Sequence, residues 1–292
     1  MTLIGTDDGT RAPGPIRLSP KQVLAPIVMV VAAAGLMTFA ANSGGTLEDP
    51  VGHRVYEVGI IVTALAILAF GIWQSVRVGQ FSSLCLMSFA AGTAFWQETY
   101  GDWGAYLLYS ERFTHYGWGE TMWTSPVKPW WVIAGYVAFY TPLFLSLIAA
   151  VNFVRLRWPN RNEYLLAALM SLPIFYAFDL VFEGTTVGLG FWNYTYVFGP
   201  AVSIGDGTFP LLWPIVEQVP FMAIAAYGLT WRNDRGQSLF DVAAQRVLRR
   251  VPGQIAILVS WIVILNATFL TTTILPIMLM RWIAGPASSL VP

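Results

Sequence analysis

The stretch Phe-Trp-Gln-Glu-Thr-Tyr-Gly-Asp-Trp-Gly, residues 95–104, closes a hydrophobic segment that begins near Ser82. Its two acids, Glu98 and Asp102, are four residues apart and can therefore share one face of a helix. They lie where an apolar helix should be leaving the bilayer, and ionisable groups at membrane depth are costly to bury. The stretch predicts a membrane helix that ends in a functional pair of acids.

The composition of the whole chain agrees with a membrane location. Of its 292 residues, 56% are hydrophobic and only 11% are charged, which is far from the usage of soluble domains. The predicted fold class is all-α, a polytopic bundle of helices embedded in the lipid bilayer. The formal net charge is zero, so no basic excess is available to neutralise phosphates, and nucleic acid is excluded as a partner.

Seven hydrophobic segments predict seven transmembrane helices, each close to the roughly 17–25 residues that a bilayer requires. They cover residues 23–41, 55–73, 82–97, 130–154, 163–182, 209–230 and 255–280. No internal repeat is present, so residues 21–285 form a single predicted membrane domain. Residues 1–20 are rich in Gly, Pro, Thr and Asp and predict a disordered tail, and residues 286–292 predict a short C-terminal tail.

Lysine and arginine are distributed unevenly between the segments that join these helices. A cytoplasmic N-terminus places twelve of the sixteen on the cytoplasmic side and leaves four outside, namely Arg54, Arg112, Lys128 and Arg281. The positive-inside rule therefore predicts a multi-pass cell-membrane protein with its N-terminus in the cytoplasm and its C-terminus outside. Residues 237–250 mix apolar side chains with Arg and Asp and predict an amphipathic helix on the inner surface.

Further acids are predicted at the same outer level of the bundle. Asp179 and Glu183 are four residues apart on the fifth helix, which Gly184 is expected to end. Glu217 lies about two turns into the sixth helix. The candidate catalytic residues are therefore Glu98, Asp102, Asp179, Glu183 and Glu217. Alternative interpretations remain open: Asp102 beside Gly101 as a turn residue, Glu183 in the headgroup region, and Asp179 or Glu217 as a structural hydrogen-bond partner.

Tryptophan and tyrosine are dense in the two predicted outer loops, residues 101–129 and 184–208. Such residues can form an interfacial belt. They can also close an apolar cavity and present ring faces to a carbocation or an oxocarbenium ion. The candidate substrate-binding residues are Trp96, Tyr100, Trp103, Trp192, Tyr194 and Trp213.

This set of residues is suited to acid–base chemistry on a hydrophobic substrate. A carboxyl group in apolar surroundings can stay protonated and act as a general acid, while a better-solvated carboxylate acts as a base. No phosphate-binding loop, dinucleotide motif, nucleophile elbow or zinc-protease motif is present, and neither a metal nor a cofactor is expected. The acid pairs could in principle hold Mg²⁺ for a diphosphate, but basic residues are sparse on that side. A single cysteine, Cys85, excludes a disulfide within the chain.

The residues 95–106, together with 128–133 (Lys-Pro-Trp-Trp-Val-Ile) and 179–184 (Asp-Leu-Val-Phe-Glu-Gly), resemble the AveC-like spirocyclase family of actinobacterial membrane proteins. The similarity runs from the first helix to the last and leaves out the N-terminal tail. The founding member is associated with forming the spiroketal of a macrolide polyketide, in secondary metabolism, and with a dehydration beside it. The resemblance implies a multi-pass membrane cyclase or dehydratase without an obvious cofactor, and it supplies no catalytic motif to carry over residue by residue.

A second resemblance involves residues 183–194, whose acid followed by Gly, Trp and Tyr is similar to segments of membrane carotenoid and terpene cyclases. The predicted function is thus acid-catalysed cyclisation or dehydration of a hydrophobic polyketide or isoprenoid. The alternative from another class is a transporter or lipid-binding membrane protein whose acids bind protons or cations. The absence of inverted repeat halves disfavours a transporter, and the sequence leaves the oligomeric state open.

Overall fold

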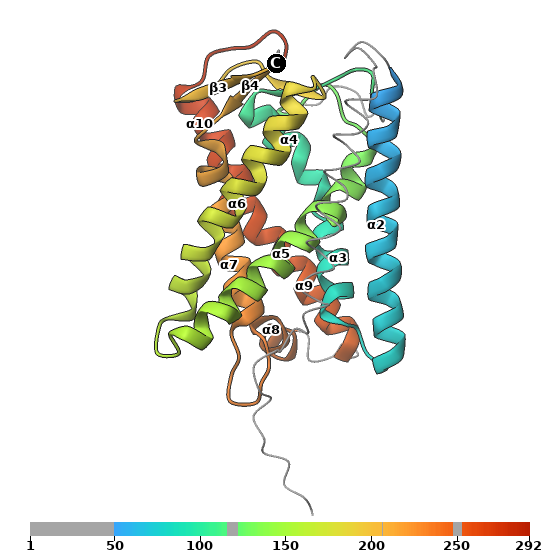
Figure 1. The fold of residues 1–292 in the computed structure, drawn as a ribbon, viewed down its shortest axis with the longest axis vertical. Helices are drawn as coiled ribbons and strands as arrows, with labels where there is room; N and C mark the ends of the chain where they lie inside the picture. The colour runs from blue at the N-terminus through green and yellow to red at the C-terminus, as the bar shows by residue number, and fades with distance from the viewer. Residues whose placement is uncertain (1–49, 116–121, 206, 248–252) are drawn as a thin grey trace, which may run out of the picture.

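The computed structural model describes residues 50–115, 122–205, 207–247 and 253–292 (Figure 1). This part of the chain is mostly helical. Its long elements are α2 (Pro50–Val78), α5 (Trp131–Arg157), α6 (Glu163–Gly188) and a continuous rod of α9 (Gly253–Phe269), η3 (Leu270–Ile274) and α10 (Leu275–Ala284). The tail predicted over residues 1–20 and the helix predicted over residues 23–41 lie outside the described residues.

Four helices in the described part are long and apolar enough to cross a membrane: Val51–Val78, Trp131–Arg157, Tyr164–Gly188 and Gly253–Ala284. They correspond to the predicted spans 55–73, 130–154, 163–182 and 255–280, and each is longer than predicted. The structure therefore confirms a predominantly helical architecture compatible with a membrane. The other two predicted spans that fall within the described residues are interrupted.

The first interrupted span is residues 82–97. Helix α3 (Ser83–Gly92) is followed by a 3₁₀ turn, η1 (Phe95–Gln97), and then by α4 (Glu98–Ala105). Near the break, the Thr93 hydroxyl donates to the Ala90 carbonyl at 2.8 Å and accepts from Asn266 Nδ2 at 3.0 Å. Polar side chains thus make hydrogen bonds where the regular helix stops.

The predicted loop beginning at residue 101 consequently starts too early. Helix α4 continues to Ala105 and ends at Tyr106, which adopts the left-handed conformation with φ of 59°. Asp102 therefore lies within a helix, and its alternative interpretation as a turn residue is wrong. Gly104 lets this last turn of α4 pack closely against α10, because a Cβ at its position would lie 2.7 Å from Ile277 Cγ2.

The second interrupted span is residues 209–230. Strand β4 (Gly207–Pro210) comes first, then a π-helical turn, η2 (Pro214–Gln218), and then α7 (Val219–Thr230). The predicted helix therefore began too early, and Glu217 lies in its first turn. The side chain of Glu217 lies outside the described part of the structure.

Each of the two π-helical turns, η2 and η3, ends two residues before a proline, Pro220 and Pro276 respectively. Proline lacks an N–H, and its ring crowds the carbonyl four residues earlier. The wider turn accommodates this, since the Val219 N–H bonds to the Pro214 carbonyl and the Leu275 N–H bonds to the Leu270 carbonyl. The two turns contact each other, so the helices are widened side by side.

Helix α6 does not end at Gly184, as the sequence predicted, but continues to Gly188. Gly184 serves close packing instead, because a Cβ there would lie 3.0 Å from Ile204 Cδ1 on strand β3 (Ala201–Ile204). The chain leaves the helix through Gly190, whose φ of +68° favours glycine. The longer helix keeps Asp179 and Glu183 within regular helical geometry.

Two small antiparallel sheets of two strands each, which the sequence did not predict, lie at one end of the bundle; the second is a β-hairpin (Figure 1). Strand β1 (Leu107–Tyr109) pairs with β2 (Trp192–Tyr194) so that Tyr109 faces Trp192, and β3 pairs with β4. We call this the hairpin end. The β1–β2 sheet joins the two long loops on which the aromatic residues were predicted.

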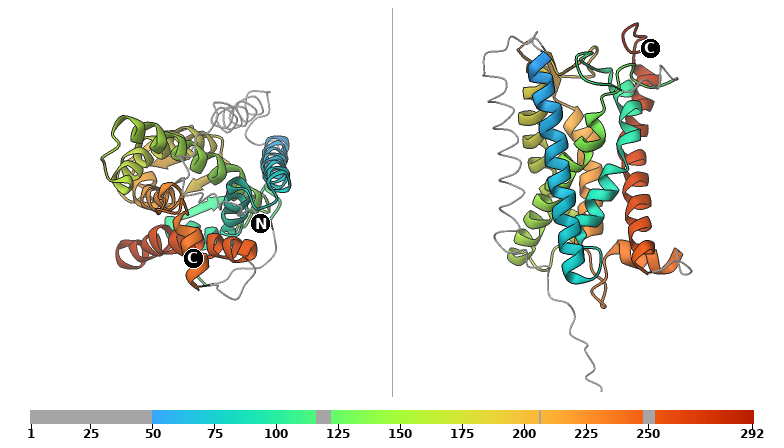
Figure 2. Two further views of the ribbon diagram at one scale, coloured as in Figure 1. Left: turned by 90° about the horizontal axis from the view of Figure 1, so that it is seen from below. Right: turned by 90° about the vertical axis from the view of Figure 1, so that its right-hand side faces the viewer.

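The opposite end carries α8 (Leu239–Val247), which lies across the bundle (Figure 2). We call it the α8 end. The Ser238 hydroxyl and N–H both donate to Asp241 Oδ2, at 2.7 and 2.8 Å, and the Phe240 ring stacks on Trp261 at 4.5 Å. The amphipathic helix predicted within residues 237–250 is confirmed over this range.

The C-terminal segment packs against the hairpin end. Buried Arg281 lies over the rings of Trp103 at 3.9 Å and Tyr106 at 4.2 Å, and it donates to the carbonyls of Trp103 and Val291. Val291 is fully buried. Residues predicted to form a short tail are thus hydrogen-bonded to the end of α4.

Candidate active site

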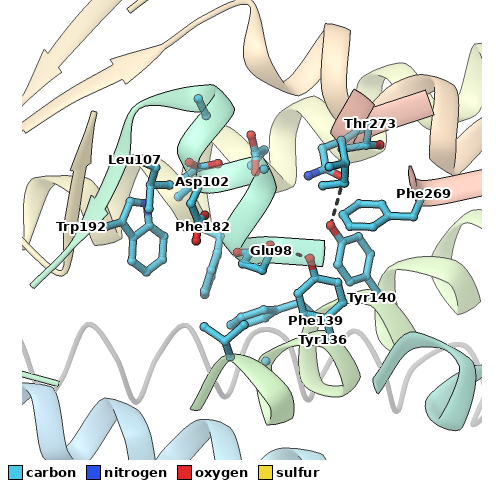
Figure 3. Close-up of a pocket in the computed structure, with 18 of the residues that line it drawn as sticks. Glu98, Asp102, Leu107, Tyr136, Phe139, Tyr140, Phe182, Trp192, Phe269 and Thr273 are labelled. Atoms are coloured by element: carbon cyan, nitrogen blue, oxygen red, sulfur yellow. Dashed lines mark hydrogen bonds between the residues drawn. The ribbon is translucent and has the colours of Figure 1, made fainter. Parts of the chain in front are cut away.

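A cavity of about 130 Å³ lies among the helices at the hairpin end (Figure 3). Its wall is built by α4, α5, α6, the β1–β2 sheet, the two π-helical turns and the adjoining ends of α9 and α10. Four predicted catalytic residues and two predicted substrate-binding residues line it: Glu98, Asp102, Asp179, Glu183, Trp192 and Tyr194. Segments far apart in the sequence therefore converge on one space.

Glu98 is held by two phenols on different elements. Tyr109 Oη, on β1, donates to Glu98 Oε1 at 2.8 Å, and Tyr136 Oη, on α5, donates to Oε2 at 2.5 Å. Burial raises the pKa of the Tyr109 phenol well above its usual value, and the charges of Asp102 and Glu98 raise it further, so this phenol remains a donor. Both oxygens of Glu98 accept hydrogen bonds, an arrangement that stabilises a carboxylate.

Asp179 and Glu183 form a second group on α6. Their spacing of four residues places them on one face, as predicted, and both line the cavity. Tyr194 Oη, on β2, donates to Glu183 Oε1. Two neighbouring carboxyl groups disfavour each other's ionised form, so this pair can hold a transferable proton. Glu98 lies near enough for its charge to act on Glu183.

Asp102 lies one helical turn from Glu98 on α4 and is only 5% exposed. It lines the same cavity, so the predicted pairing of Glu98 and Asp102 on one helix face holds in the structure. Asp179 is similarly buried, at 7%.

Aromatic rings make up most of the remaining wall. Trp131 stacks on Trp192 with ring centroids 6.0 Å apart, and Phe182 packs against Phe139 at 4.4 Å and Phe178 at 5.3 Å. All five rings line the cavity. The acids therefore share the cavity with a largely aromatic wall, and cations are attracted to the faces of aromatic rings.

Four of the six predicted substrate-binding aromatics do not line this cavity. Trp96 is 44% exposed and packs on Tyr100 at 6.3 Å. Trp103 contacts Arg281, and buried Trp213 packs against Phe198 at 5.8 Å. These residues surround the site at a greater distance, whereas Trp192 and Tyr194 reach it through β2.

The match to a family model accounts for most of the chain. The model described as "Spirocyclase AveC-like" matches residues 76–290. The chain belongs to the AveC-like spirocyclase family. Membership indicates a cyclase-type function in general, in agreement with the resemblance found in the sequence. No curated protein and no solved structure is significantly similar to the chain.

All of the cavity-lining residues described above fall within the part that matches the AveC-like family, from Glu98 to Ile277. Within the described residues, no group of three or more His, Cys, Asp or Glu side chains is arranged to hold a metal ion. The acids are instead grouped with phenols, which serve as hydrogen-bond donors.

The polar members of this AveC-like site that sequence reasoning missed include Tyr136, Tyr140, Gln218 and Thr273. Tyr140 Oη donates to Gln218 Oε1 at 3.1 Å (Figure 3). Tyr136 and Tyr140 are four residues apart in an otherwise apolar helix, which is the same signal that identified the acid pairs. Applied to tyrosine as well as to carboxylates, it would have located the α5 wall.

Proposed function

We propose that this AveC-like protein is a membrane cyclase that closes rings on a hydrophobic polyketide or isoprenoid by acid–base catalysis, with loss of water when a spiroketal forms. The observation that carries the proposal is the convergence of Glu98, Asp179 and Glu183 on one aromatic-walled cavity. It is supported by membership in a family described as spirocyclases.

The Asp179–Glu183 pair supplies the proton in this proposal. In a dihydroxy ketone, one hydroxyl adds to the carbonyl carbon and gives a hemiketal. A carboxylic acid of the pair then protonates the hemiketal hydroxyl, the C–O bond breaks, and water leaves an oxocarbenium ion. The faces of Trp131 and Trp192 can stabilise that cation as its charge develops.

Glu98 is the base that completes the reaction. The second hydroxyl attacks the oxocarbenium carbon, and its proton passes to Glu98, whose position is fixed by Tyr109 and Tyr136. Transfer of this proton from Glu98 to the Asp179–Glu183 pair restores the starting state. The net change is the loss of one water from the substrate.

The size of the cavity limits what can enter it. Drug-sized ligands occupy pockets of roughly 300–1,000 Å³, whereas this cavity measures about 130 Å³. It can therefore enclose the reacting centre of a long substrate, while the rest of the substrate extends away from the acids.

The test uses membranes that carry the wild type or the Asp179→Asn/Glu183→Gln double variant, supplied with a long-chain dihydroxy ketone. Because such ketones also close spontaneously, the readout is the rate of formation of a single spiroketal stereoisomer, with loss of one water confirmed by mass. We expect this stereoisomer from the wild type and the background mixture from the double variant. Equal mixtures from both would refute the proposal, and ion flux without a chemical product would favour a transporter.

We further propose that the chain crosses the bilayer seven times, with its N-terminus in the cytoplasm and the hairpin end outside. The support is the uneven distribution of Lys and Arg, with exposed arginines at the α8 end that include Arg157 and Arg235. A reporter fused at Asn233, in the turn before α8, tests this orientation. A signal from outside the cell would reverse the topology.

A further inference from the structure

The polar groups of the cavity form two separate sets, and the proposed reaction uses only one of them. The acids and their phenols make up the first set. The second consists of Tyr140 on α5, Gln218 on η2 and Thr273 on η3. This second set contains no carboxyl group, so it cannot carry the proton transfers proposed above.

The distance between the two sets is set by two tyrosines on α5, one in each set. Tyr136 binds Glu98, and Tyr140, one helical turn further along, binds Gln218. Four residues of α-helix rise roughly 6 Å, and the two tyrosine rings lie 5.2 Å apart. A molecule bound along this wall would therefore meet the acids at one point and the amide about one turn away (Figure 3).

The amide of Gln218 has hydrogen-bonding capacity left over. Its Oε1 accepts from Tyr140, and among the described residues its Nε2 makes no hydrogen bond. If the amide were turned by 180°, Nε2 would donate to Tyr140 and Oε1 would be the remaining atom. In either orientation one polar atom of a half-buried amide is available to a ligand in the cavity.

The backbone explains why an amide lies here. Gln218 is the last residue of η2, the widened turn that accommodates Pro220. This turn contacts the second widened turn, η3. Widened turns of this kind are frequent at functional sites because they change the direction of a side chain without ending the helix.

We propose that Gln218, oriented by Tyr140, is a specificity residue that binds a second oxygen function of the substrate, a hydroxyl or a carbonyl, about one helical turn from the reacting carbon. This inference rests on the proposed cyclase function and refines it. The Gln218 amide would favour an oxygenated substrate over an isoprenoid that is a pure hydrocarbon, because a site that hydrogen-bonds a substrate oxygen rejects the analogue that lacks it.

The test measures binding of two probes to the detergent-solubilised full chain by quenching of tryptophan fluorescence, since Trp131 and Trp192 line the cavity. One probe is a long-chain dihydroxy ketone with an extra hydroxyl roughly 6 Å from its carbonyl carbon, and the other is its parent without that hydroxyl. We expect the wild type to prefer the hydroxylated probe by about 5- to 150-fold, the range for a buried polar group left without a partner. In the variant Gln218→Met the ratio should fall close to one.

Gln254→Met is the matched control, because Gln254 bonds to the Phe81 N–H away from the cavity, and it should keep the wild-type ratio. An unchanged ratio in Gln218→Met would overturn the inference. If that variant fails to fold, Tyr140→Phe is measured in its place. An undiminished preference of Tyr140→Phe for the hydroxylated probe would overturn the inference as well. Equal wild-type affinity for both probes would also overturn it, whereas stereoselective turnover of the parent ketone would still support the proposed function.

Discussion

The two ends of the bundle differ in how deeply their charged side chains are buried. At the hairpin end, Asp102 and Asp179 are buried, and Glu98 and Glu183 accept hydrogen bonds from tyrosines. At the α8 end, five arginines are exposed, namely Arg77, Arg157, Arg161, Arg235 and Arg246. Burying a charge is costly unless partners compensate for it. The buried acids of the hairpin end are therefore expected to lower the free energy of unfolding, whereas the exposed arginines of the α8 end are not. The end with buried acids is the one at which the proposed reaction takes place.

The largest effect is expected from Glu98→Gln. The amide keeps the shape of the side chain but cannot accept the substrate's proton, and general acid–base catalysis contributes typically 10²–10⁴-fold. Stereoselective turnover should fall by about that range while the fold is retained. Asp234→Asn, the same chemical change at an exposed position of the α8 end, should leave turnover unchanged, and equal losses in both variants would erase the contrast between the ends.

A smaller loss is expected from Tyr136→Phe, which removes one phenol hydroxyl from Glu98. A hydrogen bond to a charged group contributes about 1.5–3 kcal/mol, so catalytic efficiency should fall by about 10- to 150-fold. The measurement is kcat/KM for spiroketal formation. Tyr164→Phe is the control, since Tyr164 is exposed at the α8 end and packs on Tyr227. Wild-type efficiency in Tyr136→Phe would show that Glu98 does not need this donor.

Packing should be sensitive at the hairpin end as well. In Gly104→Ala, the new methyl group would lie 2.7 Å from Ile277 Cγ2 and 3.0 Å from the Met278 backbone nitrogen. Overpacking of this kind lowers the free energy of unfolding by about 1–3 kcal/mol, which a denaturation series in detergent can measure. Gly59→Ala on α2, where no atom lies within 4 Å of the new Cβ, should not destabilise the protein. Equal stability of the two variants would contradict the close contact of α4 with α10.

The smallest effect is expected from Arg157→Gln at the α8 end. Arg157 is exposed, and surface substitutions usually change the free energy of unfolding by no more than about 0.5 kcal/mol. Thermal unfolding in detergent should therefore match the wild type. A marked loss of stability would mean that the arginines of this end also make structural contacts.

The sequence predicted the elements whose signals are local. Hydrophobic length located α2, α5, α6 and the α9–α10 rod, and i, i+4 spacing located both acid pairs. The position of Gly184 was misinterpreted because a glycine that permits close approach of another segment has the same sequence signal as one that ends a helix. The strands were missed because they are only three or four residues long, and β1 and β2 also pair across a long separation in the sequence.

The candidate site was predicted in part for the same reason. Carboxylates in an apolar segment stand out, so Glu98, Asp179 and Glu183 were identified without a structure. Tyr136 and Tyr140 resemble ordinary membrane aromatics until their partners are known. Trp96 and Trp213 lie close to Glu98 and Glu217 in the sequence, but proximity along the chain does not decide which side of a helix faces a cavity.

The paired π-helical turns have a consequence for how this chain could change over time. Each residue of an α-helix advances the side-chain direction by about 100°, so deleting one residue from η2 or η3 would rotate everything on one side of the deletion relative to the other. Such a helix would be almost as long and as apolar as before, and it would still be able to cross a membrane. Yet Phe269 and Ile277, which flank η3 and both line the cavity, would no longer point the same way. The deletion of one residue could thus leave a helix that is still long and apolar enough to cross a membrane, while the wall of the cavity is no longer complete.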